Sequence, residues 1–331
     1  MADVFLPPVT THRKMDQAAM AGIRAWWLLD FGVTEDMPRG KGIRIGSIDT
    51  GLDQIHANAG ALTGAVKHAR DFTNSTSSWA DLAGHGTHVA GILAGRGSFW
   101  GMAPEAELVV AKVLDDNGSG RSSWVAAGIR FAVDEGCHLI NCSLGSAGKS
   151  DDIEQALEYA DAHGVLVFAA SGNDGAMNNV SSPADSPFAT AVGAIDKQRE
   201  IAPFSNRGVE VDVVAPGVKI LSAYKDGKYA ELSGTSMSSP WVTGLFACLL
   251  SLQKDNGWPM MRTAPEVNKF LVTVCDDLGT AGKDITYGDG VPIPSRMFAP
   301  PVVAPVLQPA VGLPIELTIG GVRYIGSLTP A

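Results

Sequence analysis

The stretch Ser233–Pro240 carries a serine in a setting that could activate it. It reads Ser-Gly-Thr-Ser-Met-Ser-Ser-Pro and is followed by an apolar run to Leu252. Proline is tolerated in the first turn of a helix, so we expect Pro240 there and a helix that begins near Ser236. At a helix N-terminus, unpaired N–H groups and the dipole favour a developing anion. Ser236 is therefore a candidate nucleophile; on these residues alone, a helix cap is the other interpretation.

A serine nucleophile needs a base, and the base needs an acid that orients it. The segment Gly84–Gly95 reads as a helix of small residues with His85 at its N-terminal end. A pKa near neutrality suits His85 to the role of general base. We expect His88 to be a structural, hydrogen-bonded neighbour, because a helical zinc pair is spaced by four residues and comes with a glutamate.

Asp49 is the candidate for the orienting acid. It ends an apolar segment that starts at Lys41, and the residues Thr-Gly follow it. Ligands of α/β sheets bind at the carboxyl ends of parallel strands, so Asp49 is placed for chemistry. An acid that merely begins a loop is the common alternative. Aspartic proteases also use Asp-Thr-Gly, but they need two such sites and this chain has one.

Strand-like and helical segments alternate along the chain and must position these residues. Such alternation predicts an α/β fold with a parallel sheet covered by helices on both faces. We expect helices at 122–135, 151–163 and 265–275, and strands at 108–114, 138–144, 165–170, 188–195, 211–214, 219–224 and 229–232.

Three segments taken together resemble the subtilisin-like serine proteases. They are Asp49-Thr-Gly, the run His85-Gly-Thr-His-Val-Ala-Gly, and Gly-Thr-Ser236-Met with a proline after it, in the Asp, His, Ser order of that family. Residues 113–120, 210–217 and 227–229 resemble the intracellular subtilisins in particular. The resemblance covers about residues 22–290. It implies a three-layer α/β/α fold with a central, mostly parallel sheet, and serine endopeptidase activity.

The same resemblance implies a division of labour. Ser236 would attack the scissile carbonyl, His85 would take up and return the proton, and Asp49 would fix the tautomer of His85 and stabilise the imidazolium. Asn173 would bind the oxyanion together with the Ser236 N–H. By itself, an asparagine after a glycine reads as a turn residue.

Substrate-binding residues also follow from the resemblance. Two extended edges would pair with a peptide as an added strand, a mode that reads the backbone and favours broad specificity. Small apolar walls predict that large apolar side chains are accepted before the cut, although Asp174 and Asp185 are near enough in sequence to shift this preference. The residues concerned are Gly118, Ser119, Gly120, Ser143, Leu144, Gly145, Ala170, Ser171 and Gly172.

The expected chemistry needs no cofactor, and structural calcium is the one metal to consider. Many members of the resembled family carry a calcium-binding loop, but the segment Arg96–Gly101 is short and Asn58 stands where an aspartate ligand is usual. We expect the strongest calcium site to be lost, with weaker sites left open. Trp241, in place of a usual histidine, and Thr243, in place of an alanine, should alter packing rather than chemistry.

Composition limits the partners and the location. The chain has 331 residues, 45% of them hydrophobic, and a net charge of -10. This size supports a large core, and the charge argues against nucleic acid or an anionic membrane as the main partner. We find neither an apolar run of about 18 residues nor a secretory signal. The four cysteines lack metal-ligand spacing and suggest buried thiols. We therefore expect a cytoplasmic enzyme that acts on proteins or peptides.

Three segments make up the expected domain organisation. Residues 1–20 form an N-terminal extension, 21–291 the catalytic domain, and 292–331 a proline-rich linker with a C-terminal β-hairpin tail. A short helix is expected at 21–29. Our hypothesis is that Phe5–Pro8 lies over the active site as an inhibitor until removed; a merely packed or disordered terminus is the alternative.

Two further functions remain open on the sequence. One is a processing protease dedicated to a single partner, and the other is a peptide-binding scaffold that no longer cleaves. The intact set of Asp49, His85, Asn173 and Ser236 argues against the scaffold.

Overall fold

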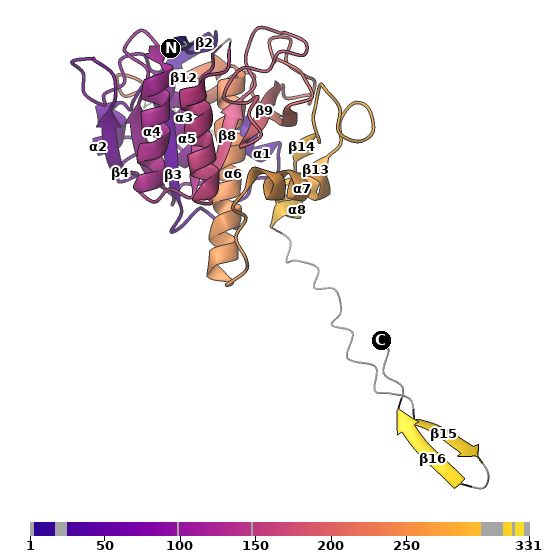
Figure 1. The fold of residues 1–331 in the computed structure, drawn as a ribbon. Helices are drawn as coiled ribbons and strands as arrows, with labels where there is room; N and C mark the ends of the chain where they lie inside the picture. Colours follow the sequence, from indigo (N-terminus) through magenta and orange to yellow (C-terminus); the bar gives the residue numbers. More distant parts are fainter. Residues whose placement is uncertain are drawn as a thin grey trace. The chain divides into compact units, whose positions relative to one another are not determined.

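Seven strands form a parallel sheet at the centre of the computed structural model (Figure 1). The described residues are 3–16, 25–97, 99–146, 148–298, 314–319 and 322–327. The strand order is β10 (Val211–Pro216), β9 (Ala189–Ile195), β8 (Leu166–Ala170), β7 (Leu139–Cys142), β3 (Arg44–Asp49), β5 (Glu107–Lys112) and β4 (Val66–Asp71). All six pairings between these neighbours are parallel.

The buried strands of this sheet were predicted from the sequence, and the half-exposed one was not. Every residue of β7, β8, β9 and β10 is buried, as expected for a parallel sheet covered on both faces. The edge strand β4 was not predicted, because its residues Val-Lys-His-Ala-Arg-Asp are half-exposed and carry no apolar run.

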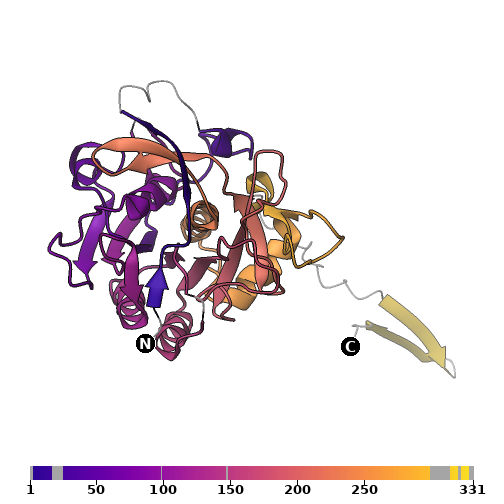
Figure 2. The same cartoon turned by 90° about the horizontal axis from the view of Figure 1, so that it is seen from above.

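Helices cover both faces of the sheet, which confirms the three-layer α/β/α prediction. Seen from above, α4 (Ser122–Asp134) and α5 (Asp151–Ala162) lie on one side of the sheet, and α3 (His85–Ala94) and α6 (Thr235–Asp255) lie on the other (Figure 2). The remaining helices are α1 (Trp26–Leu29), α2 (Gln54–Ala59), α7 (Ala264–Val274) and α8 (Pro294–Met297). No helix among the described residues is both long and apolar enough to cross a membrane.

The position of Pro240 corrects one expectation. Helix α6 begins at Thr235, so Pro240 is its sixth residue and lies beyond the first turn. A proline in the helix interior cannot donate to the carbonyl four residues earlier, which here belongs to Ser236. The hydroxyl of Ser143 donates to that oxygen instead, at 2.9 Å.

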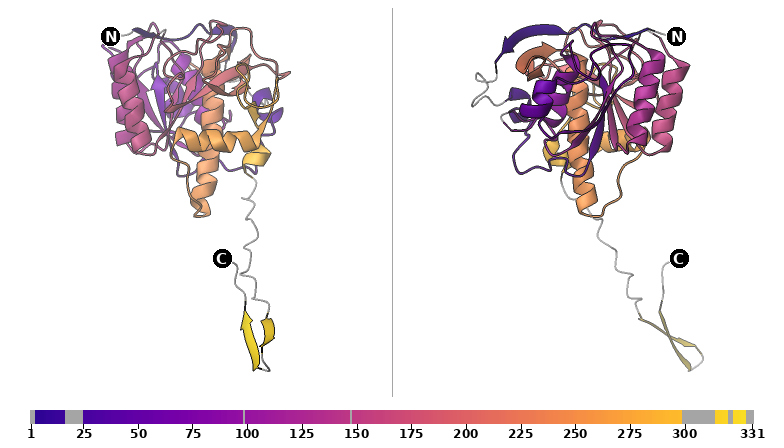
Figure 3. Two further views of the ribbon diagram at one scale, coloured as in Figure 1. Left: turned by 45° about the vertical axis from the view of Figure 1, so that its right-hand side comes forward. Right: turned by 90° about the vertical axis from the view of Figure 1, so that its left-hand side faces the viewer.

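A small antiparallel sheet lies beside the central one. It has the order β11 (Ile220–Tyr224), β12 (Lys228–Ser233) and β2 (Thr10–Met15). The strands predicted at 219–224 and 229–232 therefore exist, but they belong to this sheet and not to the parallel one. A second strand of the N-terminal segment, β1 (Asp3–Phe5), pairs with β6 (Ser119–Arg121). The N-terminal segment thus runs over the same end of the molecule as β12 (Figure 3).

Trp241 packs as the sequence analysis expects. Its side chain is buried, and its Nε1 donates to the carbonyl of Trp27 at 3.0 Å. The ring of Phe31 meets it edge-on, with 5.8 Å between the ring centroids. These contacts attach α1 to α6.

The chain divides into two units, Met1–Phe298 and Ala299–Ala331. In the first unit, β13 (Cys275–Asp276) and β14 (Val291–Pro292) also form a short antiparallel pair. In the second, β15 (Pro314–Ile319) and β16 (Val322–Ser327) pair antiparallel, as predicted for the tail. The expected turn at 320–321, the linker residues 299–313 and residues 17–24 lie outside the described residues, so only α1 tests the helix predicted at 21–29.

Candidate active site

Asp49 and His85 meet at the carboxyl end of the central sheet. Asp49 ends β3 and His85 begins α3, and His85 Nδ1 donates to Asp49 Oδ1 at 2.8 Å. The two side chains are only 1% and 3% exposed. Gly86 permits this approach, because a Cβ there would lie 2.3 Å from the Gly51 carbonyl oxygen and 3.1 Å from Asp49 Oδ1.

A buried polar network holds this pair in place, and the sequence analysis missed it. Asp81 accepts hydrogen bonds from the Thr50 hydroxyl at 2.8 Å and from the N–H and hydroxyl of Thr87 at 2.8 and 2.6 Å. Thr50 in turn accepts from the Gly86 N–H through its hydroxyl, and from Lys112 Nζ through its carbonyl at 2.7 Å. The available signal was an acid shortly before a helix of small residues, since Asp81 accepts the Thr87 N–H in the first turn of α3.

Opposing effects set the pKa of His85. Burial by itself lowers the pKa, but the charge and hydrogen bond of Asp49, together with the charge of Asp81, raise it above 6.5. His88 behaves differently, as expected. Its Nε2 contacts the carbonyls of Ile220 and Ala230 at 3.0 Å each, and burial lowers its pKa to about 3, so it stays neutral.

Ser236 lies in the first turn of α6, which packs against α3. Its side chain is fully buried, and its hydroxyl donates to the Ser143 carbonyl at 3.3 Å. His85 Nε2 is also buried and has no hydrogen-bond partner among the described residues. The structure therefore brings Asp49 and His85 into direct contact, whereas a hydrogen bond between His85 and Ser236 is not formed in this arrangement.

Asn173 follows β8 and is fixed by Thr235, a residue the sequence analysis did not single out. Asn173 Oδ1 accepts from both the N–H and the hydroxyl of Thr235, at 2.8 Å each. The amide group is thereby oriented, and its Nδ2 donates to the carbonyl of Pro8 at 3.0 Å. Asn173 thus binds a peptide carbonyl that the chain itself supplies.

Asn141 links β7 to the helix that carries Ser236. Its Nδ2 donates to the hydroxyl of Ser143, and its Oδ1 accepts from the hydroxyls of Ser239 and Thr243, at 2.7 and 3.2 Å. Thr243 therefore contributes a hydrogen bond as well as packing. This bond holds Asn141, the side chain that connects β7 to α6.

The predicted substrate edges hold the N-terminal segment as an added strand. Phe5 exchanges backbone hydrogen bonds with Gly145 at 3.0 and 3.2 Å, and Leu6 N–H donates to the Gly118 carbonyl at 3.0 Å. Val4 pairs with Gly120 and is only 1% exposed. Ser119 lies in the same register, opposite Phe5.

The predicted pocket walls lie after β7 and β8. Ser143, Leu144, Ala170 and Ser171 are buried, as is Gly172, whose φ is +111°. Asn206, missed from the sequence, supports this loop: its Oδ1 accepts from the N–H groups of Asp174 and Ala176 at 2.9 and 3.0 Å. Of the two acids expected to influence specificity, Asp185 pairs with Lys149 at 3.6 Å.

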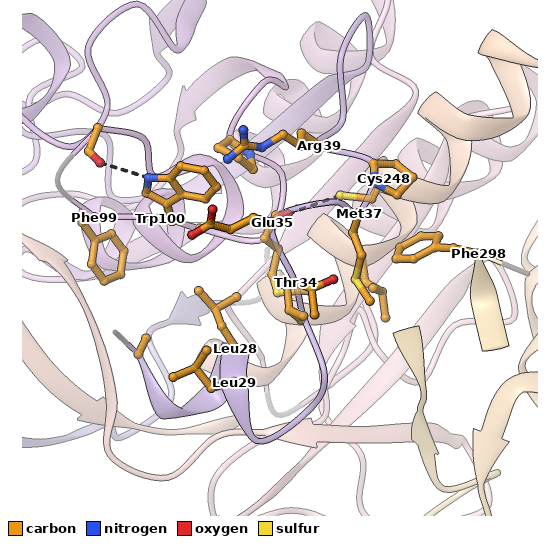
Figure 4. A pocket seen from close by; sticks show the side chains of 18 residues that line it. Leu28, Leu29, Thr34, Glu35, Met37, Arg39, Phe99, Trp100, Cys248 and Phe298 are labelled. Carbon is orange, nitrogen blue, oxygen red and sulfur yellow. Dashed lines mark hydrogen bonds between the residues drawn. The ribbon is translucent and has the colours of Figure 1, made fainter. Parts of the chain in front are cut away.

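A separate pocket of about 430 Å³ contains none of the predicted site residues (Figure 4). Its lining is mainly apolar and comes from α1, the 33–39 and 97–104 segments, α6 and Phe298. Cys248 is its potential nucleophile, but burial raises the pKa of that thiol. The Cys248 thiol is therefore held in its neutral, less nucleophilic form.

The guanidinium group of Arg96 binds three backbone carbonyls near the 96–101 loop. Arg96 donates through Nε to the Ala94 carbonyl at 3.3 Å, through Nη1 to Gly64 at 3.2 Å and through Nη2 to Ala106 at 2.6 Å. Within the described ranges, no group of three or more His, Cys, Asp or Glu side chains could hold a metal ion.

Comparisons with known proteins match most of the first unit. Residues 40–290 match the model of the Subtilase family. Subtilisin Savinase of Lederbergia lenta is 40% identical over 255 residues, which are 76% of this chain and 89% of that protein. The "Thermophilic serine proteinase" of Bacillus sp. (strain AK1) is 39% identical over 76% of this chain and 61% of its own length. The "Major intracellular serine protease" of Bacillus subtilis (strain 168) is 37% identical over 66% of this chain and 71% of its own length.

Proposed function

This chain belongs to the subtilase family and is a subtilisin-like serine protease, and we propose that Asp49, His85 and Ser236 form its catalytic triad. The observation that carries the assignment is the buried 2.8 Å contact between Asp49 and His85. It stands at the N-terminal end of a helix that packs against the helix of Ser236.

The roles follow from the atoms each residue presents. Since Nδ1 of His85 donates to Asp49, Nε2 is the nitrogen left to accept the proton of Ser236 as the hydroxyl attacks the scissile carbonyl. The attack forms an ester with the acyl half of the substrate, and the imidazolium gives its proton to the leaving amine. Water then hydrolyses the ester by the same proton route. Asp49 stabilises the imidazolium without becoming protonated.

Asn173 and the Ser236 N–H are the proposed oxyanion donors. Support comes from the Nδ2 of Asn173, which already donates to a peptide carbonyl, that of Pro8, at 3.0 Å. Thr235 fixes the amide before substrate arrives, so no reorganisation is needed when charge develops.

Broad cleavage with apolar residues preferred before the cut is the proposed specificity. Its support is the small, buried lining made by Ser143, Leu144 and the 170–172 segment. A protease dedicated to one partner stays the second candidate; cleavage of an unrelated unfolded protein at many sites would exclude it.

Self-inhibition by the N-terminal segment is a second part of the proposal. Three observations support it. β1 pairs with a predicted substrate edge, Asn173 Nδ2 donates to the Pro8 carbonyl, and the Val4 side chain is buried. Pro7 and Pro8 fix their own φ angles, which limits how far the segment can adjust toward a reactive geometry. The hydroxyl of Ser236 meanwhile contacts Ser143 rather than His85.

We also propose that Arg96 takes the place of a structural calcium ion at its loop, and that the enzyme acts inside the cell. The second statement draws on similarity to the Bacillus subtilis intracellular protease and on four cysteines that are buried and unpaired by disulfides. Both remain proposals.

Intact-mass labelling with a fluorophosphonate tests the triad. We expect one adduct on the wild type and on Ser251→Ala, a control serine in the same helix, and none on Ser236→Ala. Val4→Glu places a carboxylate in a buried position of β1, so we expect it to be labelled about tenfold faster or more, whereas the exposed control Asp3→Asn keeps the wild-type rate. Absence of an adduct on Val4→Glu would contradict the triad; equal rates for Val4→Glu and wild type would contradict self-inhibition.

A further inference from the structure

The outer edge of β12 is covered by the chain's own N-terminal segment. β12 is the middle strand of its sheet, with β11 on one side and β2 on the other. β2 directly follows the residues that pair with the predicted substrate edges, Phe5 and Leu6, and the residue whose carbonyl accepts from Asn173, Pro8. A polypeptide that takes the place of these residues will therefore have its continuation near the edge of β12.

We propose that the edge of β12 binds the part of a protein substrate that follows the cut, as an added antiparallel strand, and that Glu231 selects a basic residue there. The inference rests on the proposed proteolytic function. It adds a site for an extended, basic peptide segment beyond the reacting bond.

Backbone pairing is the first support. The register between β2 and β12 runs from Thr10 opposite Ser233 to Met15 opposite Tyr229, with one extra residue, His12, on β2 between the positions opposite Leu232 and Glu231. Five of the six β2 residues are exposed, so the strand gains little from apolar burial and depends on its main-chain ladder. An extended peptide of almost any sequence can form such a ladder on an open sheet edge.

Charge is the second support. Arg13 Nη2 lies 2.8 Å from Glu231 Oε1, and Glu231 is the less exposed partner, at 23% against 55%. On the neighbouring position of β2, Lys14 Nζ lies 5.0 Å from the ring centroid of Tyr224. Arg13 and Lys14 are thus consecutive basic residues on opposite faces of β2, and each contacts a side chain of β11 or β12.

The register gives the preferred position. The carbonyl that accepts from Asn173 Nδ2 belongs to Pro8, so the bond that a substrate presents corresponds to the one between Pro8 and Val9. Arg13 comes five residues after Pro8. For a substrate that follows the path of this segment, a basic residue is therefore favoured at the fifth position after the cut.

The experiment compares two peptides in one tube, using full-length enzyme that carries Val4→Glu. Both peptides share all other residues and differ only at the fifth position after the cut, which is Arg in one and Glu in the other. Because the peptides compete for the same enzyme, the ratio of their kcat/KM values does not depend on how much of the enzyme has its N-terminal segment displaced. A third peptide that ends two residues after the cut reports on catalysis alone.

We expect the Arg peptide to be cleaved about two- to fivefold faster, the range for a partly exposed ion pair. Glu231→Lys should invert the ratio, while Glu158→Lys, at an exposed position of α5, should leave it unchanged. Methylating successive backbone nitrogens of the Arg peptide should slow cleavage at alternate positions, which a long-range charge effect would not do.

Equal rates for the two peptides, or a ratio that survives Glu231→Lys, would overturn the inference. Cleavage of the short peptide keeps this failure distinct from a failure of the proposed function: if the short peptide is cut and the ratio is one, only the β12 site is wrong. If the short peptide is not cut either, the proteolytic assignment itself is wrong.

Discussion

At the residue scale, the proposal depends on how burial and charge act on His85. A general base must be neutral, and the contact with Asp49 raises the pKa above 6.5 against the effect of burial. Activity should therefore fall as the pH drops through this raised pKa, so the acid limb of kcat/KM lies above pH 6.5. Asp49→Asn removes the attraction, so we expect the limb to move to lower pH and kcat to fall by about 10⁴. The pH profile on a short peptide measures both effects.

The control for this prediction is Asp196→Asn, in an exposed turn. It should leave the acid limb where it is. An acid limb that stays in place in Asp49→Asn would show that another group titrates in the free enzyme.

At the element scale, the N-terminal turns of α6 depend on a hydrogen bond from outside the helix. Pro240 cannot donate to the Ser236 carbonyl, and Ser143 does so instead. Ser143→Ala leaves that buried carbonyl without its partner, so we expect a loss of about 1–3 kcal/mol in the free energy of unfolding and a lower kcat. Denaturant titration measures the first, and peptide hydrolysis the second. Ser146→Ala, which removes a hydroxyl that donates to the nearby Gly148 carbonyl, is the matched control.

The loop that follows α3 is the second case at this scale. Arg96 donates to three backbone carbonyls there. Arg96→Ala should lower the free energy of unfolding by about 2 kcal/mol, because hydrogen bonds to a charged group are lost. Arg130→Ala, which loses one exposed carbonyl contact and a ring contact with Tyr159, should lower it less. The melting temperature of Arg96→Ala should lie equally far below that of the wild type whether a chelator or calcium is added. Recovery of the melting temperature by calcium would contradict the role given to Arg96.

At the scale of the whole molecule, the first residues of the chain complete two sheets built from residues far along it. β1 pairs with β6 and β2 pairs with β12, and Val4 is buried in the process. Displacing this segment should raise activity and lower stability together. We expect Val4→Glu to lower the melting temperature by several degrees while peptide hydrolysis increases. A variant that gains activity with no change in melting temperature would show that the segment binds without stabilising the fold.

Sequence patterns alone predicted most of the architecture, because a parallel sheet buried on both faces requires continuous apolar strands. β7, β8 and β9 follow such runs closely, whereas the half-exposed β4 carries none. Asp49, His85 and Ser236 were proposed as site residues from short motifs whose residue types suit acyl transfer, and Asn173 was added only through the resemblance to a family. The start of α6 was predicted to within one residue, but Pro240 lies beyond its first turn, where the hydroxyl of Ser143 donates to the carbonyl that Pro240 cannot reach.

Long-range contacts are what only the tertiary structure decided. Asp81, Asn141 and Asn206 lack motifs of their own, and their importance comes from partners that are distant in sequence. Thr235 stands in the Ser236 motif, but its role comes from the equally distant Asn173. The N-terminal segment was suspected from Phe5–Pro8, but the sequence could not show that β2 covers β12 or that Arg13 meets Glu231. Strand pairing is set by backbone groups that every residue carries, so the choice of partner appears only when the whole chain has folded.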